Sequence, residues 1–558
     1  MSLLNSNLSA TGAQSTGEDF AERVRRNQQR LRSELKPAYD FIVCGSGSSG
    51  SVVAGRLAEN PEVNVLLLEA GGHDEVSSVV NANQWPLNLG SERDWGFHGQ
   101  PNPHINGRST PFSMGKVLGG GSSINVMVWA RGHRADWDLF ASEANDPAWS
   151  YRSILNIYRR IEDWHGVPDP VYRGTGGPLF VQPAPNPNPL APATVEAAQS
   201  VGLPAFANAN SSMMEAPRGA SISDVLVRDG KRESVFRSYV FPLMDRPNLT
   251  VLTDALVTRV AFRGKRATGV EIAHGGATYR IGAAAEVILS LGAIHTPMVL
   301  MQSGVGDETE VRRLGIPVVQ HLPGVGHNFQ DHVAFDCVWE YQTALPPRNN
   351  MSEAILFATT SAALQSPDLF ACQAEVPKTT PENAAHFGMP GAGWTLFGAV
   401  AHPASRGRVR LTGPDPSDPV LIEANTLSEP ADMAAALRCI ELCREIGNAA
   451  PLRSFVKREV MPGKLKGPEL ERFVRNAATS FWHETGTAKM GRDAMSVVNG
   501  DLKVHGIEHL RIGDGSVMPR VTAGNTMAPC VIIGERAAEM LSDAQDLTAL
   551  TSQPLPAG

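Results

Sequence analysis

Two short apolar runs near the start of the chain, separated by a glycine-rich turn, form its clearest pattern. Tyr39–Cys44 is predicted to be a short buried strand, and Ser51–Ala58, made mostly of small and apolar residues, is predicted to be a helix. A second apolar strand, in the segment VNVLLLEA, ends on Glu69. Strand, helix and strand in this order predict a βαβ unit of a parallel sheet.

Four later segments carry further patterns of the same kind. Residues 248–262 and 267–292 are rich in β-branched and apolar side chains and are predicted to form strands. Residues 431–447 repeat apolar side chains at helical spacing, and residues 526–541 predict a helix that is apolar on one face. No apolar run approaches the ~20 residues that a membrane-spanning helix needs, so we expect no membrane span.

Length and composition narrow the class of protein. At 558 residues the chain is too long for one compact core, so two domains are expected. Hydrophobic residues make up 42% and charged residues 19%, with 53 Gly and 40 Pro, which is typical of a loop-rich globular protein. The net charge of −8 implies no basic face, so we expect no binding to nucleic acid.

The cysteines and the N-terminus bear on the compartment. The six cysteines form no CxxC pair, so free thiols in a reducing compartment are expected. Cys439 and Cys443, four residues apart on a predicted helix, are interpreted as core residues rather than metal ligands. The pair Arg25 and Arg26 is not followed by the apolar run of an export signal. The sequence therefore predicts a cytoplasmic protein without a metal site.

The turn between the first strand and the helix contains the pattern GxGxxG, formed by Gly45, Gly47 and Gly50. The first glycine permits a tight turn, the second lets the backbone approach a pyrophosphate, and the third allows the helix to pack closely on the strand. Glu69, at the end of the next strand, is placed to accept hydrogen bonds from ribose hydroxyls. Together these features predict a bound dinucleotide, either NAD or FAD.

Three longer segments carry a resemblance to a known family. The loop GKVLGGGSSINVMVWARG, Gly115–Gly132, offers many backbone N–H donors and resembles the first signature of the glucose–methanol–choline (GMC) family of flavoprotein oxidoreductases. The segment GAIHTPMVLMQSGVG, Gly292–Gly306, resembles the second signature. FWHETGTAKMG, Phe481–Gly491, together with LRIGDGSVMPRVTAGNTMAPCVIIGERAAEML at residues 510–541, resembles a third conserved stretch of the family. With the glycine turn, the resemblance spans nearly the whole chain, from Asp40 to about Leu541.

The resemblance implies an α/β fold in which a doubly wound, Rossmann-like FAD-binding domain is interleaved with an α+β substrate domain built on an antiparallel sheet. The FAD-binding domain is expected to comprise residues 38–139, 231–332 and 481–545. The substrate domain is expected to comprise residues 140–230 and 333–480. Residues 1–37 would form an N-terminal extension, and residues 546–558 a C-terminal tail.

The resemblance also bears on how FAD is held. Relatives that bind FAD covalently use a histidine four residues before the lysine of the GKxLGG run. In this chain the lysine is Lys116, and Phe112 occupies the earlier position. A phenylalanine cannot form a bond to the flavin, so FAD is expected to be bound non-covalently.

His483, between a tryptophan and a glutamate, could by itself be a metal ligand, a structural histidine or a base. The zinc pattern HExxH is broken because Thr487 stands where the second histidine would be. The resemblance implies that His483 is the base of an alcohol oxidation and that Asn525 donates its amide to the same substrate oxygen. His332 is interpreted as structural.

The resemblance further implies a set of residues that contact the cofactor through the glycine turn, the glycine-serine loop and the C-terminal region. They are Gly45, Gly47, Ser49, Gly50, Glu69, Val117, Gly121, Asn125, Val128, Val257, Trp482, Asp514, Gly515 and Met527.

The activity that the resemblance implies is FAD-dependent oxidation of a primary alcohol to an aldehyde by hydride transfer to flavin N5. An aryl or medium-chain alcohol is slightly favoured, although aromatic residues could instead cage the quaternary ammonium of choline. A choline-type dehydrogenase and a hydroxynitrile lyase without redox turnover stay open as alternatives. The electron acceptor would be O₂ or another acceptor, and the protein a monomer or a homodimer. The aromatic candidates are Phe335, Trp339, Tyr341, Trp394, Phe397 and Trp482.

Overall fold

The structure, a computed structural model, describes residues 19–544. The expected C-terminal tail, and residues 1–18 of the expected N-terminal extension, lie outside the described residues. Across residues 19–544, none of the helices combines the length and the apolar character needed to cross a membrane.

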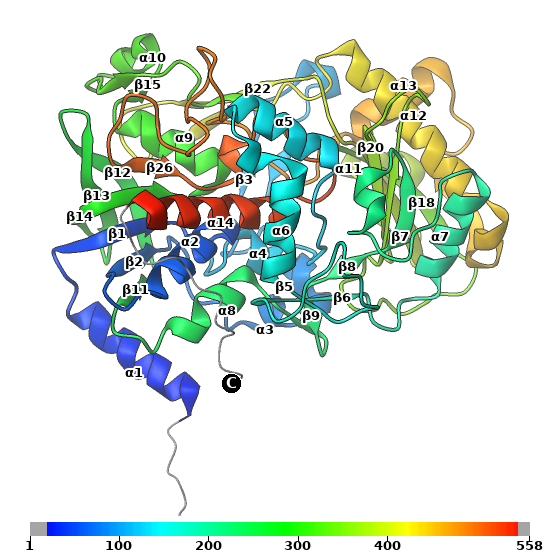
Figure 1. The fold of residues 1–558 in the computed structure, drawn as a ribbon. Coiled ribbons are helices and arrows are strands. Elements are labelled where there is room, and N and C mark those ends of the chain that lie inside the picture. Colours follow the sequence, from blue (N-terminus) through cyan, green and yellow to red (C-terminus); the bar gives the residue numbers. More distant parts are fainter. Residues whose placement is uncertain (1–18, 545–558) are drawn as a thin grey trace, which may run out of the picture.

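The first of two large sheets contains the predicted βαβ unit (Figure 1). Its parallel strands are buried on both faces, which explains their nearly continuous apolar sequence. Two further strands extend it in an antiparallel manner. In spatial order the strands are β11 (Leu249–Leu252), β2 (Val65–Leu68), β1 (Ala38–Cys44), β14 (Ala277–Leu289), β13 (Arg266–His274) and β12 (Ala255–Arg263), with β26 (Leu510–Ile512) also paired to β14.

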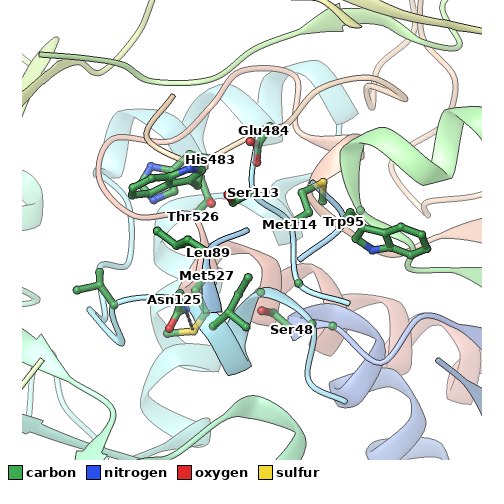
Figure 2. A pocket seen from close by; sticks show the side chains of 18 of the residues that line it. Ser48, Leu89, Trp95, Ser113, Met114, Asn125, His483, Glu484, Thr526 and Met527 are labelled. Atoms are coloured by element: carbon green, nitrogen blue, oxygen red, sulfur yellow. Dashed lines mark hydrogen bonds between the residues drawn. The ribbon is translucent and has the colours of Figure 1, made fainter. Parts of the chain in front are cut away.

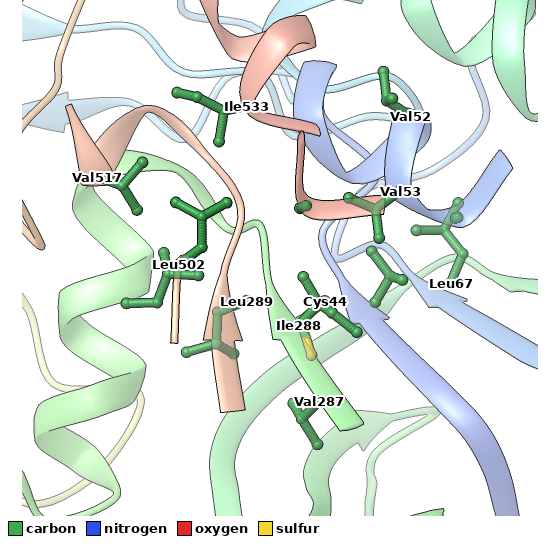
Figure 3. Close-up of a cluster of buried hydrophobic side chains, with 14 of the residues drawn as sticks. Cys44, Val52, Val53, Leu67, Val287, Ile288, Leu289, Leu502, Val517 and Ile533 are labelled. Atoms are coloured by element: carbon green, nitrogen blue, oxygen red, sulfur yellow. The ribbon is translucent and has the colours of Figure 1, made fainter. Parts of the chain in front are cut away.

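Two helices from opposite ends of the chain cover one face of the first sheet (Figure 1). These are α2 (Ser48–Ala58) and α14 (Met527–Ala544). The two helices approach each other closely at Gly534. A Cβ at this position would lie 2.7 Å from the carbonyl oxygen of Ser49, so the close approach requires a glycine. Figure 3 shows the core between them and the sheet, with Val52 and Ile533 above β1 and β14. The helix predicted from Ser51 begins at Ser48, since the extended backbone of Gly47 lets the first turn form earlier.

The helix α1 (Phe20–Ser33) lies against the edge of the first sheet at β11. The buried amide of Gln28 donates to the carbonyl oxygens of Met244 and Leu249 and accepts from the backbone N–H of Val251. These bonds satisfy part of the backbone of an edge strand that would otherwise stay exposed.

The second sheet is antiparallel throughout, as the resemblance implied. Side chains along its strands alternate between two faces, so that Leu396 packs toward the covering helices while Phe397 packs on the opposite side. In spatial order the strands are β24 (Val456–Met461), β18 (Val333–Tyr341), β21 (Gly393–Val400), β20 (Leu369–Ala374), β19 (Ala354–Ala358) and β7 (Gly219–Ile222), with β25 (Thr479–Ser480) also paired to β18.

The predicted helix at residues 431–447 is α12 (Pro430–Gly447), which lies across the outer face of the second sheet. Cys439 and Cys443 are buried free thiols on this helix, in agreement with their interpretation as core residues. Both sulfur atoms face Gly398 of β21, where the missing side chain leaves the space that they fill. A glycine in this strand therefore sets the distance between the helix and the sheet.

Shorter elements complete the chain. The remaining helices are α3 (Ser77–Val80), α4 (Gly121–Ile124), α5 (Arg134–Ala144), α6 (Tyr151–Ile161), α7 (Leu190–Ser200), α8 (Val235–Tyr239), α9 (Gly292–Gln302), α10 (Glu308–Arg313), α11 (Pro381–Phe387) and α13 (Gly467–Ala477). The remaining strands are β3 (Phe97–His98), β4 (Pro111–Phe112), β5 (Glu162–Trp164), β6 (Leu179–Pro183), β8 (Asp224–Val225), β9 (Val227–Arg228), β10 (Lys231–Arg232), β15 (Val305–Gly306), β16 (Gln320–His321), β17 (His327–Phe329), β22 (Gly407–Leu411) and β23 (Val420–Glu423).

The packing at Gly398 gives a test of the second sheet. In Gly398→Ala the new methyl group would lie 2.7 and 2.8 Å from the Sγ atoms of Cys439 and Cys443. We expect the free energy of unfolding to fall by about 1–3 kcal/mol, as is usual for an overpacked core. In a Cys439→Ala/Cys443→Ala background the same change should cost less, because the two sulfur atoms are gone. Urea unfolding measures both, and an equal loss in the two backgrounds would contradict this packing.

Candidate active site

A cavity of about 670 Å³ lies between the two sheets, lined by residues of both (Figure 2). Gly45, Glu69 and Val257 line it from the first sheet. Phe397 and Cys372 line it from β21 and β20 of the second sheet. The cavity therefore reaches from the glycine turn to the inner face of the antiparallel sheet.

The glycine turn shows why each of its positions lacks a side chain. Gly45 has a φ of +95°, and a Cβ there would lie 2.3 Å from the carbonyl oxygen of Ser290. A Cβ at Gly50 would lie 1.9 Å from the carbonyl oxygen of Gly45, so this glycine packs the helix against the strand. A Cβ at Gly47 would meet no protein atom within 4 Å. Gly47 precedes α2 and has no side chain to cap it, which leaves the positive helix terminus open to the cavity.

Glu69 follows β2 and is buried at the cavity wall. Its Oε2 accepts hydrogen bonds from the backbone N–H and the hydroxyl of Ser46, at 3.1 and 2.6 Å. Its Oε1 accepts from the backbone N–H of Gly71 at 2.9 Å. Burial raises the pKa of the carboxyl, and these donors oppose the rise. The donors hold the carboxylate in one orientation, and Oε1, which accepts from Gly71 alone, retains a lone pair for a ligand hydroxyl.

Asn125 connects the glycine-serine loop to the start of α14. Its Nδ2 donates to the Sδ of Met527 at 3.0 Å, and its Oδ1 accepts from Arg232 at 2.8 Å (Figure 2). Asp514 is tied to the protein more fully, since it accepts from the backbone N–H groups of Ser516 and Gly292 and from the hydroxyl of Thr296. Asp514 therefore shapes the loop at the cavity wall.

The lining of the cavity fits FAD. At Gly47 and at Gly121 an added Cβ would meet no protein atom, so both backbones are bare toward the cavity. The N-terminal end of α2 supplies partial positive charge for a diphosphate, and Glu69 supplies acceptors for ribose hydroxyls. A second helix terminus, that of α14 at Met527, lines the same cavity. Glycine turn, carboxylate and helix termini together are the donor and acceptor set of a dinucleotide site.

His483 lies in the cavity wall beyond β25 and is 8% exposed. It is held by its backbone N–H, which donates to Oδ1 of Asp331 at 3.0 Å, and it follows Trp482, whose φ of +61° turns the chain. Nδ1 of its ring lies 2.8 Å from Nδ1 of His332, and its Nε2 lies 3.4 Å from Nδ2 of Asn525. Burial lowers the pKa of His483 to about 3, so the imidazole is neutral near pH 7.

The contact between the two histidines has a consequence for proton positions. Two facing Nδ1 atoms at hydrogen-bond distance require that one carries a proton and the other accepts it. Burial and the nearby His483 together hold the pKa of His332 well below its usual value, so this ring is also neutral. If His483 is the donor, its Nε2 carries no proton and faces the amide of Asn525 as an acceptor.

Two carboxyl groups lie behind the histidine pair. Burial raises the pKa of Asp331 to about 7 and raises that of Glu484 well above its usual value. The hydroxyl of Ser480 donates to Glu484 at 3.4 Å. Both carboxyl groups therefore hold their protons more readily than in water, and burial is what lowers the pKa of His483.

Most of the residues that the sequence predicted for the site are brought together around the cavity. Two are not: Val117 is fully buried in the protein core, and Gly50 packs the helix α2 against β1. Phe112, the position of the tether in some relatives, is also buried outside the cavity wall. The predicted residues that line the cavity are Gly45, Gly47, Ser49, Glu69, Gly121, Asn125, Val128, Val257, Trp482, His483, Asp514, Gly515, Asn525 and Met527.

The structure adds residues that sequence reasoning missed. His332 contacts His483 directly, although it was interpreted as structural. His295, whose pKa burial lowers to about 3, lies against Trp95 with ring centroids 3.9 Å apart, and both line the cavity. Lys378 lines it from the loop after β20. His295 lies within Gly292–Gly306, the segment that resembles the second family signature, which was the available signal.

Of the six aromatic candidates, only two face the cavity. Phe397 and Trp482 line it. The other four, Phe335, Trp339, Tyr341 and Trp394, are buried in the core of the second sheet and its helices.

Comparison with known proteins agrees with this geometry. Models of the GMC oxidoreductase family match residues 39–334 with their N-terminal part and residues 403–534 with their C-terminal part. The oxygen-dependent choline dehydrogenase of Klebsiella pneumoniae is 35% identical over 552 residues, covering 93% of this chain and 99% of that protein. The alcohol dehydrogenase (acceptor) of Pseudomonas putida is 33% identical over 542 residues, covering 92% of this chain and 97% of that protein.

Solved structures share the fold. Pyridoxine 4-oxidase from Mesorbium loti superposes with a TM-score of 0.84 at 29% identity, covering 90% of this chain and 98% of that one. A fungal aryl-alcohol oxidase superposes with a TM-score of 0.79 at 22% identity, covering 92% of this chain and 100% of that one. With the cavity described above, these matches establish that the chain belongs to the GMC oxidoreductase family, as an FAD-dependent enzyme that acts on CH–OH donors.

Proposed function

We propose that the protein oxidises a primary alcohol to an aldehyde, with His483 as the base. The observation that carries this proposal is the neutral imidazole of His483 in the cavity wall, with its Nε2 beside the amide of Asn525. An alcohol has a high pKa, so its oxidation needs a group that takes the hydroxyl proton as the carbon loses a hydride. The chemistry that bound FAD supplies is acceptance of that hydride at N5.

The two polar residues divide the work at the substrate oxygen. Asn525 donates from Nδ2 and orients the hydroxyl, while His483 accepts its proton at Nε2. Oδ1 of Asn525 is buried without a hydrogen-bond partner, so the amide is not committed elsewhere in the wall. Both residues are less than a tenth exposed, which keeps bulk water from competing for the same positions.

His332 acts through His483 as a positioning residue. In the proposed arrangement Nδ1 of His483 donates to Nδ1 of His332, which leaves Nε2 of His483 free of a proton and aimed at the substrate. A neutral imidazole has one N–H, so the wrong tautomer would place it at Nε2 and abolish the base. The buried contact with His332 thus selects the productive tautomer.

An aryl or medium-chain primary alcohol fits the cavity, because Phe397, Phe481 and Trp482 line it together with apolar Met351 and Met389. A choline-type dehydrogenase is the second candidate, supported by several relatives of that name. One is the mitochondrial choline dehydrogenase of Mus musculus, 35% identical over 543 residues and covering 91% of this chain and 90% of that protein.

Replacing His483 with Ala tests the base. The variant should fold and retain FAD, but alcohol-dependent flavin reduction should slow by about 10²–10⁴-fold, the usual contribution of a general base. Anaerobic stopped-flow absorbance near the flavin band measures this rate. His295→Ala is the matched control, because His295 is also a buried, neutral histidine of the cavity but contacts Trp95. Near-normal reduction in His483→Ala would refute the role.

The pH dependence follows from the low pKa of His483. The base works in its neutral form, and because burial lowers its pKa to about 3, lowering the pH from 8 to about 5.5 should leave the flavin reduction rate unchanged. Asp331→Asn is the companion variant, because Asp331, with a pKa of about 7, is the group beside His483 that titrates in this range, and its rate should be equally independent of pH. A rate that rises with a midpoint near 6.5 in both proteins would show an ordinary, exposed imidazole.

The His332 contact is tested by two substitutions of different chemistry. His332→Leu removes the acceptor and should lower kcat by about tenfold or more, with KM less affected, because the wrong tautomer of His483 is then populated. His332→Asn keeps an oxygen that can accept from Nδ1 and should restore much of the rate. If the two variants lose activity equally while remaining folded, His332 only fills space.

A further inference from the structure

A lysine stands in the cavity wall at the end away from the glycine turn. The ammonium nitrogen of Lys378 lies 3.7 Å from the ring centroid of Phe397 and 5.6 Å from that of Trp482. It donates to Oδ1 of Asp336 at 3.2 Å, and the side chain of Lys378 is 31% exposed. The aromatic faces at this end are therefore already in contact with a cation that belongs to the protein.

The position of this lysine is fixed by the second sheet. Asp336 of β18 and Phe397 of β21 are direct cross-strand partners, so both side chains are presented to Lys378 from neighbouring strands. The backbone N–H of Lys378 donates to the hydroxyl of Thr395, also on β21, at 3.0 Å. Asp336 is fully buried and takes one donor of the ammonium group, while the half-buried side chain of Lys378 lines the cavity.

Aromatic rings connect this lysine to the base. The ring centroids of Phe397 and Phe481 are 4.3 Å apart, and those of Phe481 and His483 are 5.0 Å apart. A substrate whose hydroxyl lies at His483 can thus extend along these rings toward Lys378. Of the acids that line the cavity, Glu69 and Asp514 accept from backbone donors near the glycine turn and the α14 terminus, and burial holds the pKa of Glu484 well above its usual value.

We propose that Lys378 selects the substrate: it favours an aryl alcohol that carries a carboxylate on the side away from the hydroxyl, and it disfavours quaternary ammonium alcohols. This rests on the proposed alcohol oxidation at His483. A carboxylate accepts hydrogen bonds from the free N–H groups of the ammonium. A choline-like cation meets a like charge at the aromatic faces that would otherwise bind it.

The test compares three para-substituted benzyl alcohols on the FAD-loaded enzyme: the carboxylate, the methyl compound and the aminomethyl compound. We expect the second-order rate constant of anaerobic flavin reduction to fall in that order, by about tenfold per step. This factor corresponds to about 1.4 kcal/mol. Choline should be a poorer substrate than 3,3-dimethylbutan-1-ol, the uncharged alcohol of the same shape. An order in which the cations lead would overturn the proposal.

Variants locate the preference at this pair. Asp336→Asn removes the counter-charge and should increase the preference for the carboxylate. Asp336→Asn/Lys378→Met removes both charges, which avoids a buried unpaired aspartate, and should abolish the preference for the carboxylate over the methyl and aminomethyl compounds. Lys457→Met, at an exposed lysine paired with Glu340, is the control and should change nothing. An unchanged preference in the double variant would overturn the assignment to Lys378.

Failure of the proposed activity is separable from failure of this inference. If no alcohol reduces the flavin, the oxidation proposal fails. The inference about Lys378 is then tested by binding alone. The shift of the flavin absorption band measures binding of two unreactive ligands, para-methylbenzoate and para-methylbenzylamine. Tighter binding of the benzoate that is lost in Asp336→Asn/Lys378→Met supports selection by Lys378. Equal binding of the two ligands, or tighter binding of the amine, contradicts it.

Discussion

The chemistry that we propose for this protein depends on one neutral imidazole held in a buried cavity wall. His483 is buried, and burial alone lowers its pKa to about 3. The carboxyl groups behind it, Asp331 and Glu484, are themselves pushed toward their neutral forms, so they do not restore the charge. A base with so low a pKa is weak, but it stays in its neutral, proton-accepting form across the ordinary pH range. Its orientation is set by the protein groups that contact it.

Those neighbours come from distant parts of the chain. His332 precedes β18 of the second sheet, His483 follows β25 of the same sheet, and Asn525 precedes α14, which packs on the first sheet. The polar residues at the reacting position are therefore assembled only where the two sheets meet. The residues that we propose for the cofactor lie mainly on the first sheet and its loops, and the substrate end that we propose lies on the second, so the cavity needs both sheets.

Sequence reasoning could reach the features that local chemistry dictates. Gly45 and Gly50 occupy positions where any side chain would strike a backbone oxygen, so the turn could be recognised from the residues themselves. The contact of His332 with His483 joins residues 151 positions apart, and no local pattern encodes it. Val117 shows the opposite limit, since a motif match does not say which way a side chain points, and this one points into the core. Lys378 lies in a loop without periodicity, and only the register of Asp336 with Phe397 explains its place.

The segment from β25 to β26 has a mechanical meaning. β25 is hydrogen-bonded to β18 in the second sheet, and β26, about thirty residues later, is hydrogen-bonded to β14 in the first. The segment is therefore fixed at both ends, one in each sheet, and His483 lies just after its end in the second sheet. Because the two ends of this segment are held by different sheets, a shift of one sheet relative to the other would change the 3.4 Å between Nε2 of His483 and Nδ2 of Asn525. The spacing of these two polar side chains is thus set by how the two sheets pack against each other.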